Sequence, residues 1–415
     1  LQYAGNVGTG FNEQTLRDLR EKLDALASDT RPFAAGNVIP GKVHWVKPEL
    51  MAEVAFGEWT RDHRIRHSVF HGLRSDKPAK AITREVPKHE APVDKPAKTS
   101  KAAKAAKPAN APKAAAPTPG LPASLRVSNP QRVIDDSTGT TKLDLVRYYA
   151  LVAPLMMEHL KGRPVSLVRA PDGIGGELFF QKHAERYQMP GIEQLDPAFF
   201  PGHPPMLEVA TPEGLLSAAQ MNVIEFHTWN GVKSALTKPD RMTFDLDPGE
   251  GIGWQQVQEG TQLVRSFLTE LGLPAFLKTS GGKGLHVVVP LRKQYDWDTV
   301  KDFSKAIVEH LARAIPQRFV AKSGPKNRVG KIFIDYLRNG YGATTAAAWS
   351  ARARPGLGIS VPVRWEELPG LTGGAHWTVG SIHTRLDEGN APWADYAGSA
   401  TALTAAMKAL GFKRS

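Results

Sequence analysis

The 415-residue sequence contains no cysteine. This excludes disulfides and thiolate zinc sites, so any bound metal must be held by oxygen or imidazole ligands, which suit hard cations such as Mg²⁺ and Mn²⁺. The sequence also lacks an apolar run of the roughly 18 residues needed to cross a membrane, and it lacks a signal-peptide pattern. We therefore expect a cytoplasmic protein with no membrane partner. Because the chain starts at Leu1 rather than at methionine, we expect it to be part of a longer polypeptide.

Acidic residues are too few to balance the lysines and arginines, and the formal net charge is +12. Positions 76–123 hold ten lysines and arginines against four acids, which accounts for half of that excess. The stretch repeats Lys, Pro and Ala with few large apolar side chains, so it predicts a basic disordered linker over residues 78–122. Such a linker either holds phosphate backbones nonspecifically or is a soluble spacer. It separates two predicted domains, residues 1–77 and 123–415.

The two domains differ in their apolar patterns. A helix around 15–26 and strand-like runs at 42–46 and 51–59 predict a small α+β or β-barrel unit before the linker. After it, a helix is predicted over 143–160, followed by strands at 165–169 and 177–181.

From residue 241 the pattern predicts the order β-α-β-β-α-β. The strands are expected at 241–247, 275–280, 284–291 and 331–337, with helices at about 254–271 and 298–315. In this ferredoxin-like or RRM-like topology, right-handed crossovers place the first strand between the third and the fourth. The fold class is accordingly α+β.

Two carboxylates share one face of the first of these strands. Asp245 and Asp247 alternate with apolar neighbours, and Asp335 interrupts an apolar run on the last strand, which the topology places alongside. Three converging carboxylates predict a two-metal site for Mg²⁺ or Mn²⁺. The alternative for an isolated Asp-x-Asp is a solvated strand end before a proline turn.

A glycine-rich hairpin is expected on the other side of the central strand. It contains Ser280, Lys283 and His286, whose donors suit polyphosphate oxygens, and its glycines would let backbone N–H groups approach an anion. Alternatively, the glycines merely permit a tight turn. The hairpin is not a Walker A loop, because Gly284 follows Lys283 and a strand comes next.

Several further side chains are candidate ligand contacts. Arginines that suit phosphate oxygens are expected on the far side of Asp335, namely Arg328, Arg338, Arg352 and Arg354. His227 lies on the strand face opposite Ile224 and Phe226, either as a structural histidine or as a substrate contact. Phe179 and Phe180 are adjacent on a strand, so one of them should leave the core and could stack on a nucleobase; core packing is the alternative.

Three motifs occur in order: Asp-Leu-Asp-Pro at 245–248, Ser-Gly-Gly-Lys-Gly-Leu-His at 280–286 and Ile-Asp-Tyr-Leu-Arg at 334–338. From about residue 124 onward the chain resembles the polymerase domain of bacterial DNA ligase D, within the archaeo-eukaryotic primase superfamily. The resemblance implies a primase-polymerase fold. It also implies a template-dependent nucleotidyltransferase that fills gaps and extends ends in nonhomologous end joining, using nucleoside triphosphates. The absence of cysteine makes the zinc motif of replicative primases impossible, so gap filling is favoured over de novo priming.

The resemblance also implies roles for single residues. Asp245, Asp247 and Asp335 would be the catalytic metal ligands. The nucleotide contacts would be Ser280, Lys283, His286, Arg338 and Arg352, together with Arg328 and His227. Asn129, Arg132 and Lys142 would hold the 5′-phosphate of gapped DNA, and Phe179 and Phe180 would pack against template bases. Implied partners are DNA ends, a Ku-type end-bridging protein and the remaining ligase and end-processing domains.

The first segment, residues 1–77, is similar to the C-terminal end of the ATP-dependent ligase module, part of an OB-fold. It lacks the nucleotidyl-accepting Lys-x-Asp-Gly motif, because Lys22-Leu23-Asp24 is followed by Ala25. We therefore expect no nick sealing by this fragment alone. Two other functions remain open: a metal-dependent glycosyltransferase, which also uses Asp-x-Asp, and a noncatalytic module that binds DNA ends.

Overall fold

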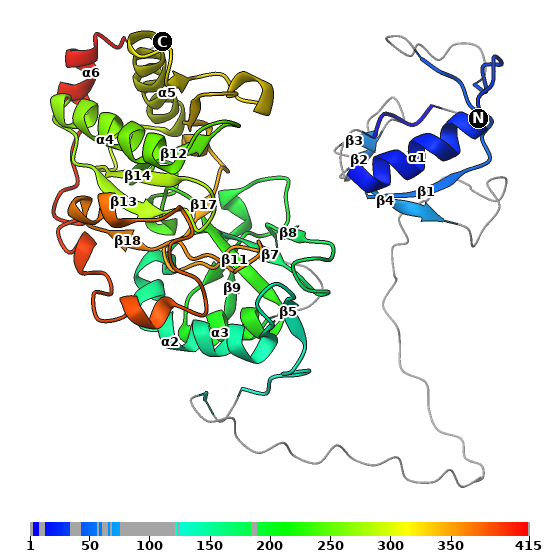
Figure 1. The fold of residues 1–415 in the computed structure, drawn as a ribbon, viewed down its shortest axis with the longest axis horizontal. Coiled ribbons are helices and arrows are strands. Elements are labelled where there is room, and N and C mark those ends of the chain that lie inside the picture. Colours follow the sequence, from blue (N-terminus) through cyan, green and yellow to red (C-terminus); the bar gives the residue numbers. More distant parts are fainter. Residues whose placement is uncertain are drawn as a thin grey trace, which may run out of the picture. The chain divides into compact units, whose positions relative to one another are not determined.

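The computed structural model describes residues 3–7, 13–33, 43–55, 58–59, 65–66, 69–74, 121–122, 125–183 and 189–413. The chain divides into two compact units, Leu1–Asn110 and Ala111–Ser415 (Figure 1). Apart from residues 121–122, the predicted linker lies outside the described residues. In the described part of the chain, no helix combines the length and the apolar character needed to cross a bilayer.

The smaller unit contains one helix and two short antiparallel ladders. Helix α1 spans Glu13–Ala25, strand β1 (Met51–Ala55) pairs with β4 (Val69–Arg74), and β2 (Glu58–Trp59) pairs with β3 (Ile65–Arg66). The prediction of one strand over 51–59 is therefore wrong, because β1 and β2 have different partners. The described part of the predicted strand at 42–46 contains only an isolated bridge between Val46 and Ala27.

The larger unit contains two six-stranded sheets. The first, which we call the β11 sheet, has the order β17-β11-β7-β10-β9, and β8 also pairs with β7. Its strands are β7 (Val165–Arg169), β8 (Phe179–Gln181), β9 (Ile192–Gln194), β10 (Leu207–Val209), β11 (Val223–Thr228) and β17 (Thr345–Ala346). Helices α2 (Lys142–Leu160) and α3 (Pro212–Gln220) share one hydrophobic core with it.

The second sheet, the β12 sheet, has the order β15-β16-β12-β14-β13-β18. Its strands are β12 (Arg241–Pro248), β13 (Phe276–Thr279), β14 (Leu285–Pro290), β15 (Phe319–Val320), β16 (Ile332–Asp335) and β18 (Pro362–Val363). The predicted β-α-β-β-α-β order is confirmed, and β12 lies between β14 and β16 as predicted. The short edge strands β15 and β18 were not predicted. The α+β fold class is confirmed.

One face of the β12 sheet is apolar and is covered by helices α4 (Trp254–Glu270) and α5 (Trp297–Ala314). Met242, Phe244 and Leu246 of β12 are fully buried in that core, because alternate residues of a strand face the same way. Figure 1 shows α4 and α5 on the side of β12 and β14 that faces away from β11 and β7. The opposite face of β12, which carries Thr243, Asp245 and Asp247, is thus left free of these helices.

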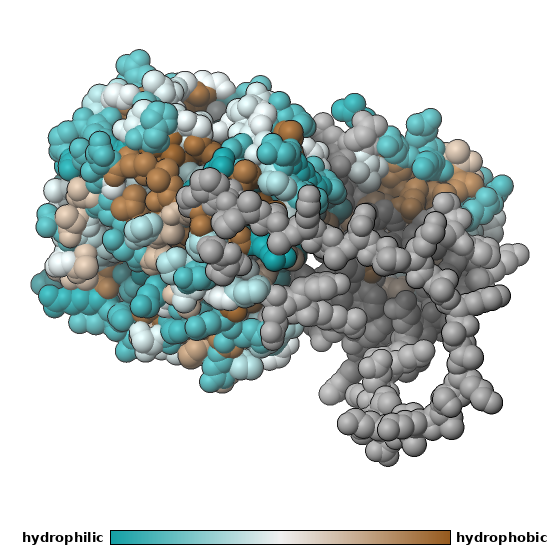
Figure 2. All heavy atoms as spheres, turned by 90° about the horizontal axis from the view of Figure 1, so that it is seen from below, coloured by the Kyte–Doolittle hydropathy of each residue, from teal (hydrophilic) through white to brown (hydrophobic). Residues whose placement is uncertain are grey.

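The helix-free face of the β12 sheet contacts the β11 sheet. Lys278 Nζ of β13 donates to Ala346 O of β17 at 2.9 Å, and Arg241 Nη2 of β12 donates to Thr228 Oγ1 of β11 at 2.6 Å. Polar side chains between the sheets are therefore buried rather than solvated. The outer surface in Figure 2 is largely hydrophilic, with a few apolar patches on the face shown.

A short hairpin precedes α2, and a short helix lies near the end of the chain. The hairpin β5 (Val133–Asp135) and β6 (Thr140–Thr141) leads directly into α2, and α6 (Thr404–Leu410) is the last helix. Thr141 and Asp144 form a capping box at the start of α2, since each side chain accepts a hydrogen bond from the other residue's backbone N–H. This cap fixes Lys142 as the first residue of the helix.

Candidate active site

Three carboxylates meet on the helix-free face of the β12 sheet. Asp245 lies directly opposite Asp335 in the β12–β16 ladder, and Asp247 follows two residues later on the same face. One carboxylate oxygen from each residue lies within 4.8 Å of the other two. The structure therefore brings together the three aspartates that the sequence singled out.

Neighbouring positive charges compensate only part of the repulsion among the three carboxylates. Burial and the charge of Asp245 raise the pKa of Asp247, and burial, with further contributions from Asp245 and Asp247, raises that of Asp335. Arg328 Nη1 lies 3.0 Å from Asp247 Oδ2, and Arg338 Nε lies 3.0 Å from Asp335 Oδ2. Two guanidinium groups thus face three carboxylates. This all-oxygen donor set fits a hard divalent cation, which would remove the remaining repulsion.

Arg338 reaches the carboxylates through a turn rather than a strand. The predicted strand at 331–337 is too long, because β16 ends at Asp335 and a 3₁₀ turn follows over Leu337–Asn339. The backbone N–H of Leu337 donates to Asp335 Oδ1 at 2.9 Å. That bond starts the turn and returns Arg338 to the carboxylate three residues before it.

The glycine hairpin between β13 and β14 is organised by a serine. Ser280 Oγ accepts hydrogen bonds from the backbone N–H groups of Gly282 at 3.1 Å and Gly284 at 3.2 Å. The N–H of Gly281 donates to Gly374 O at 2.8 Å. These three backbone donors are engaged within the protein, so anion binding by the hairpin backbone stays a prediction that they do not support. The hydroxyl hydrogen of Ser280 remains available, because its oxygen acts as the acceptor in both bonds.

At two positions of the hairpin, neighbouring atoms leave no room for a side chain, so glycine is required. Gly281 has φ +69°, and a Cβ there would lie 2.7 Å from Arg352 Cγ. A Cβ on Gly284 would overlap the carbonyl oxygen of Leu246 on the neighbouring strand. The hairpin therefore lies directly against β12, next to Asp247, and its Lys283 is exposed.

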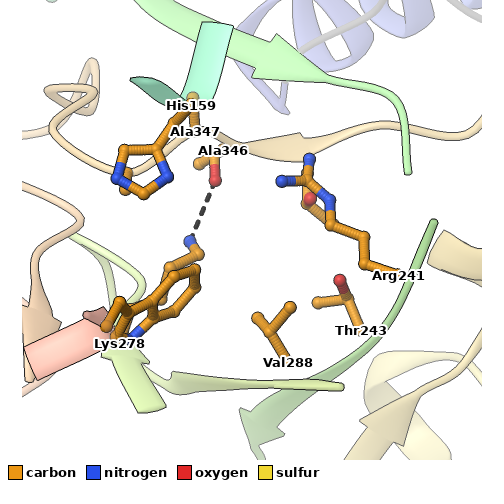
Figure 3. Close-up of a pocket in the computed structure, with 10 residues that line it drawn as sticks. His159, Arg241, Thr243, Lys278, Val288, Ala346 and Ala347 are labelled. Carbon is orange, nitrogen blue, oxygen red and sulfur yellow. Dashed lines mark hydrogen bonds between the residues drawn. The ribbon is translucent and has the colours of Figure 1, made fainter. Parts of the chain in front are cut away.

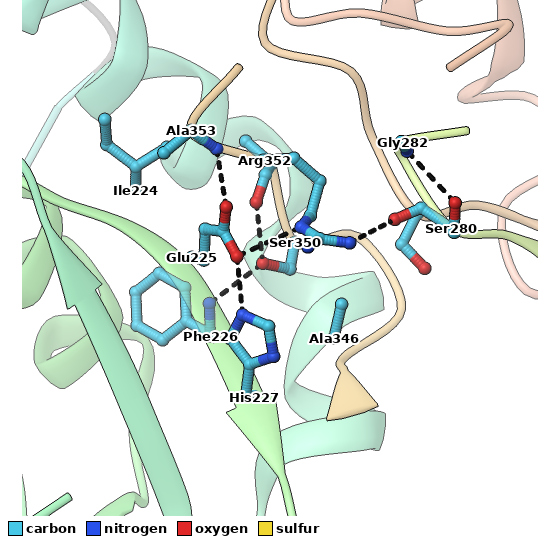
Figure 4. Close-up of polar contacts among 12 residues, drawn as sticks. Ile224, Glu225, Phe226, His227, Ser280, Gly282, Ala346, Ser350, Arg352 and Ala353 are labelled. Atoms are coloured by element: carbon cyan, nitrogen blue, oxygen red, sulfur yellow. Dashed lines mark hydrogen bonds and ion pairs between the residues drawn. The ribbon is translucent and has the colours of Figure 1, made fainter. Parts of the chain in front are cut away.

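Arg352 and Arg354 lie beside this hairpin, not beyond Asp335 as predicted. Arg352 Nη1 donates to Ser280 O at 3.0 Å, and both arginines approach Gly282. The prediction was wrong because a loop after β17 returns the chain to the hairpin, which the strand pattern alone does not indicate. Figure 4 shows Arg352 between Ser280 and Glu225.

Glu225 on β11 is the residue of this site that the sequence prediction missed. It accepts hydrogen bonds from His227 Nε2 at 2.6 Å, Arg352 Nε at 3.0 Å and Ala353 N at 2.7 Å (Figure 4). Burial acts to raise the pKa of Glu225, but these donors outweigh it and lower the pKa to about 2. Burial also lowers the pKa of His227. The signal was available, because an acid inside the apolar run at 223–228 needs a partner.

His286 contacts a carboxylate and a lysine from within the sheet. It is 2% exposed and lies opposite Asp245 in the β12–β14 ladder. Its Nε2 lies 3.3 Å from Asp245 Oδ1, and its Nδ1 lies 2.7 Å from Lys278 Nζ. Burial and the nearby Lys278 lower the pKa of His286 to about 4. The neutral imidazole is thus part of the carboxylate cluster rather than a free donor in the hairpin.

Both candidate template aromatics are exposed. Phe179 is 42% and Phe180 50% exposed, so the expectation that one of them lies in the core is wrong. They lie on β8, a three-residue strand whose only partner among the described strands is β7. The Phe180 ring packs edge-on against His227 at a centroid distance of 6.0 Å, and Lys182 Nζ lies 5.6 Å from the Phe180 ring. The aromatic pair therefore adjoins the Glu225 network.

The three predicted phosphate-binding residues gather where the β5–β6 hairpin enters α2. Asn129 and Arg132 are joined by a backbone hydrogen bond, and Lys142 N donates to Arg132 O at 2.8 Å. Lys142 is buried, and burial together with Arg132 lowers its pKa. Its Nζ donates to Ser128 Oγ at 3.1 Å, whereas Arg132 Nη2 bonds to exposed Asp172 at 2.7 Å.

The fold and this site define a primase-polymerase class of protein. The chain belongs to the LigD primase-polymerase domain family, whose model matches residues 141–393. A second family model, the C-terminal region of ATP-dependent DNA ligases, matches residues 1–77. The resemblance predicted from the motifs is confirmed.

Two curated relatives and one solved structure extend this result. The chain is 51% identical over 414 residues to the multifunctional non-homologous end joining protein LigD of Pseudomonas aeruginosa, covering 98% of this chain and 47% of that protein. It is 33% identical over 268 residues to the LigD protein of Mycolicibacterium smegmatis, covering 64% and 35%. The polymerase domain of Mycobacterium tuberculosis ligase D, solved in complex with DNA, matches with a TM-score of 0.58 and 30% identity, covering 63% of this chain and 94% of that one. The chain thus spans less than half the length of either curated relative.

Proposed function

We propose that this chain is the polymerase portion of a multifunctional ATP-dependent DNA ligase. It adds ribo- or deoxyribonucleotides to primer ends at gaps and breaks during bacterial nonhomologous end joining. The observation that carries the proposal is the convergence of three carboxylates within 4.8 Å beside the Ser280 hairpin. The names of the LigD relatives support the repair pathway.

Asp245, Asp247 and Asp335 would hold the divalent cations. Bound Mg²⁺ or Mn²⁺ would supply Lewis-acid activation and charge neutralisation. The reaction is attack of a primer 3′-hydroxyl on the α-phosphorus of a nucleoside triphosphate, with pyrophosphate as the leaving group. Arg328 and Arg338 place positive charge at the carboxylates, so the cluster is less repulsive toward the phosphates that must approach it.

The remaining site residues orient the nucleotide. The free hydroxyl hydrogen of Ser280, the exposed ammonium of Lys283 and the guanidinium of Arg352 are donors for the triphosphate. Glu225 keeps Arg352 and His227 in one arrangement before the nucleotide binds, because both are hydrogen-bonded to its carboxylate. Such preorganisation lowers the cost of binding in a reactive geometry.

The proposed DNA contacts are two exposed aromatic rings and a group of polar side chains. Phe179 and Phe180 are exposed rings on which template bases stack. Asn129, Arg132 and Lys142 hold the 5′-phosphate of the downstream strand in a gap. The remaining ligase and end-processing domains and a Ku-type protein are proposed partners, and residues 1–77 do not seal nicks without the rest of the ligase module.

Primer extension on a gapped duplex tests this function. With Mn²⁺ and each nucleotide type, the wild-type chain should extend the primer by the templated nucleotide, and Asp245→Asn should not. Asp302→Asn, an exposed acid on α5, is the matched control and should extend normally. Extension by Asp245→Asn at the wild-type rate would refute the assignment of the carboxylates.

A binding measurement separates the DNA contacts from the chemistry. Lys142→Met should weaken binding to a gap that carries a 5′-phosphate, measured by fluorescence anisotropy, and should leave binding to the unphosphorylated gap nearly unchanged. Lys408→Met, an exposed lysine on α6, should behave as wild type. An equal loss on both substrates would contradict a phosphate-specific role for Lys142.

A further inference from the structure

Four polar side chains form one row across the β12 sheet. Asp335, Asp245, His286 and Lys278 lie directly opposite one another on β16, β12, β14 and β13. Residues paired in this way project from the same face of a sheet. The first three belong to the site described above. Lys278 has no role in the proposed chemistry, although it is a basic side chain that is only 4% exposed.

Lys278 has three hydrogen-bond partners, and none of them is a carboxylate. Its Nζ lies 2.7 Å from His286 Nδ1, 2.9 Å from Ala346 O and 2.7 Å from Ser360 Oγ. A carbonyl oxygen only accepts, and Ser360 uses its own hydrogen to donate to Thr279 O at 2.7 Å. Lys278 is therefore the donor to Ala346 and to Ser360, and the direction of the third bond depends on the tautomer of His286.

The contact of the other His286 nitrogen determines where the ring carries its hydrogen. Its Nε2 faces the carboxylate of Asp245 at 3.3 Å, and a carboxylate accepts hydrogen bonds. A neutral imidazole has one N–H, which must then be on Nε2, so Nδ1 is an acceptor. This is the atom to which Lys278 donates.

We propose that Lys278 is a positioning residue, which holds the ring and the tautomer of His286 so that Nε2–H is directed at Asp245. With Oδ1 of Asp245 held by His286, Oδ2 is left on the side of Arg338, whose Nε lies 3.9 Å away. Lys278 thus orients Asp245, a proposed metal ligand, through two successive contacts: Lys278 with His286, and His286 with Asp245. The inference rests on the proposed function of the three carboxylates.

The surroundings of Lys278 favour this role over a separate ligand site. A cavity of about 10 Å³ adjoins it, lined by His159, Arg241, Thr243 and Trp393 among others (Figure 3). That volume holds roughly one water molecule and no nucleotide. Burial and the charge of Arg241 lower the pKa of Lys278 well below its usual value, so its ammonium group is costly here. An apolar side chain would fill the position at lower cost if packing were the only requirement.

The decisive variant is Lys278→Met, with Mn²⁺ binding measured by calorimetry in the full chain without nucleotide. If Lys278 positions His286, Mn²⁺ affinity should fall by about 10- to 100-fold, the usual effect of losing a group that orients a metal ligand. If Lys278 acts only as a charge, removing it should tighten Mn²⁺ binding, because a repelling cation is lost. Tighter or unchanged binding would therefore overturn the proposal.

A second measurement does not depend on the metal or on catalysis. In metal-free protein with ¹⁵N-labelled histidine, His286 should show a protonated Nε2 and an unprotonated, hydrogen-bonded Nδ1. Lys278→Met should lower the share of this tautomer, because only the 3.3 Å contact between Nε2 and Asp245 would then favour it. A single unchanged tautomer in the variant would refute the role of Lys278, whereas absence of primer extension by the wild type would refute only the proposed function.

Ser360→Ala is the matched control, since it removes another acceptor of Lys278 and leaves the bond to His286. It should keep the wild-type tautomer and Mn²⁺ affinity. Circular dichroism melting establishes that each variant is folded. If Lys278→Met does not fold, Lys278→Gln is the second variant, with the same expected result because its shorter side chain does not reach Nδ1.

In primer extension, the expected loss for Lys278→Met is in kcat rather than in the KM for the nucleotide. The reason is that His286 and Asp245 act at the reacting centre, whereas Lys283 and Arg352, which are unaffected, are the proposed nucleotide contacts. A rise in KM with unchanged kcat would contradict the positioning role.

Discussion

The carboxylates of the two sheets differ in how completely the protein compensates their charge. Burial acts to raise the pKa of Asp245, but His286 and nearby arginines outweigh it and lower that pKa to about 2; the two carboxylates beside Asp245 are not compensated in this way. On the β12 sheet, Asp247 and Asp335 have raised pKa values, because burial and neighbouring carboxylates oppose their ionisation. On the β11 sheet, Glu225 is surrounded by donors that lower its pKa to about 2. The proposed metal would neutralise the first cluster, whereas the donors around Glu225 are all supplied by the protein.

The difference distinguishes the proposed metal-binding cluster from the Glu225 network, which holds neighbouring side chains in place. A cluster of like charges is destabilising by itself and becomes favourable only when a ligand of opposite charge arrives. A satisfied buried carboxylate instead fixes the geometry of its partners, here His227 and Arg352. Substitutions in the carboxylate cluster should therefore reduce activity without reducing stability, whereas substitutions at Glu225 should mainly reduce stability.

The largest effect is expected from Asp335→Asn. Primer extension should fall by at least about 1000-fold, because bound metal supplies several kcal/mol of transition-state stabilisation. The metal-free variant should melt at the same temperature as wild type or higher, since a source of repulsion is removed. A strongly destabilised variant would show that Asp335 instead stabilises the fold, as Glu225 is expected to do.

Glu225→Gln should show the reverse combination. The amide has a donor where His227, Arg352 and Ala353 all need an acceptor, so the free energy of unfolding should fall by about 3 kcal/mol. The KM for the nucleotide should rise, because two of its proposed contacts lose their anchor. Glu208→Gln is the control in the same sheet: Glu208 is buried and bonded to Lys233 Nζ at 2.6 Å, and its loss should lower stability without changing KM.

The stability of the metal-free protein should depend on pH in opposite directions for Glu225 and Asp335. Glu225 has a folded pKa of about 2 against an ordinary value of 4.5, so its contribution is present above pH 4.5 and is lost as the pH falls toward 2. Asp335 has a pKa raised above 3.8, so its contribution is present below that pH and is lost as the pH rises through the folded value. Denaturant titrations from pH 3 to pH 7 compare the free energies of unfolding. As the pH rises, the stability of wild type should increase relative to Glu225→Gln and decrease relative to Asp335→Asn. Parallel curves would contradict both assignments.

The smallest effect concerns the Arg132–Asp172 pair, which lies outside both clusters. Asp172 is 77% exposed and holds Arg132 at 2.7 Å. Asp172→Asn should strengthen binding to a 5′-phosphorylated gap by up to about fivefold, because exposed ion pairs contribute roughly 0.2–1 kcal/mol. Anisotropy titrations check this, and a weakened complex would mean that Asp172 supports the phosphate contact.

The sequence predicted the central strand order and the three aspartates because both follow from local patterns. Apolar alternation identified β12 and β16, and crossover handedness placed them side by side. An acid at position 225 could be noticed inside its apolar run, but its partners Arg352 and Ala353 could not be identified, because they are more than 120 residues away in the chain. Likewise, the phenylalanines were misplaced because strand alternation does not reveal that β8 is a short, exposed strand.

By itself, the sequence determined that Asp245 and Asp247 share one face of a strand and that Asp335 lies on the strand beside it, because periodicity and strand pairing are encoded within a few neighbouring residues. Only the tertiary structure decided which groups of the site are already engaged. The backbone donors of the hairpin bond to Ser280 and Gly374, and His286 bonds to Asp245 and Lys278. Hydrogen bonding and burial depend on distances between distant segments, and those distances are set when the two sheets pack together.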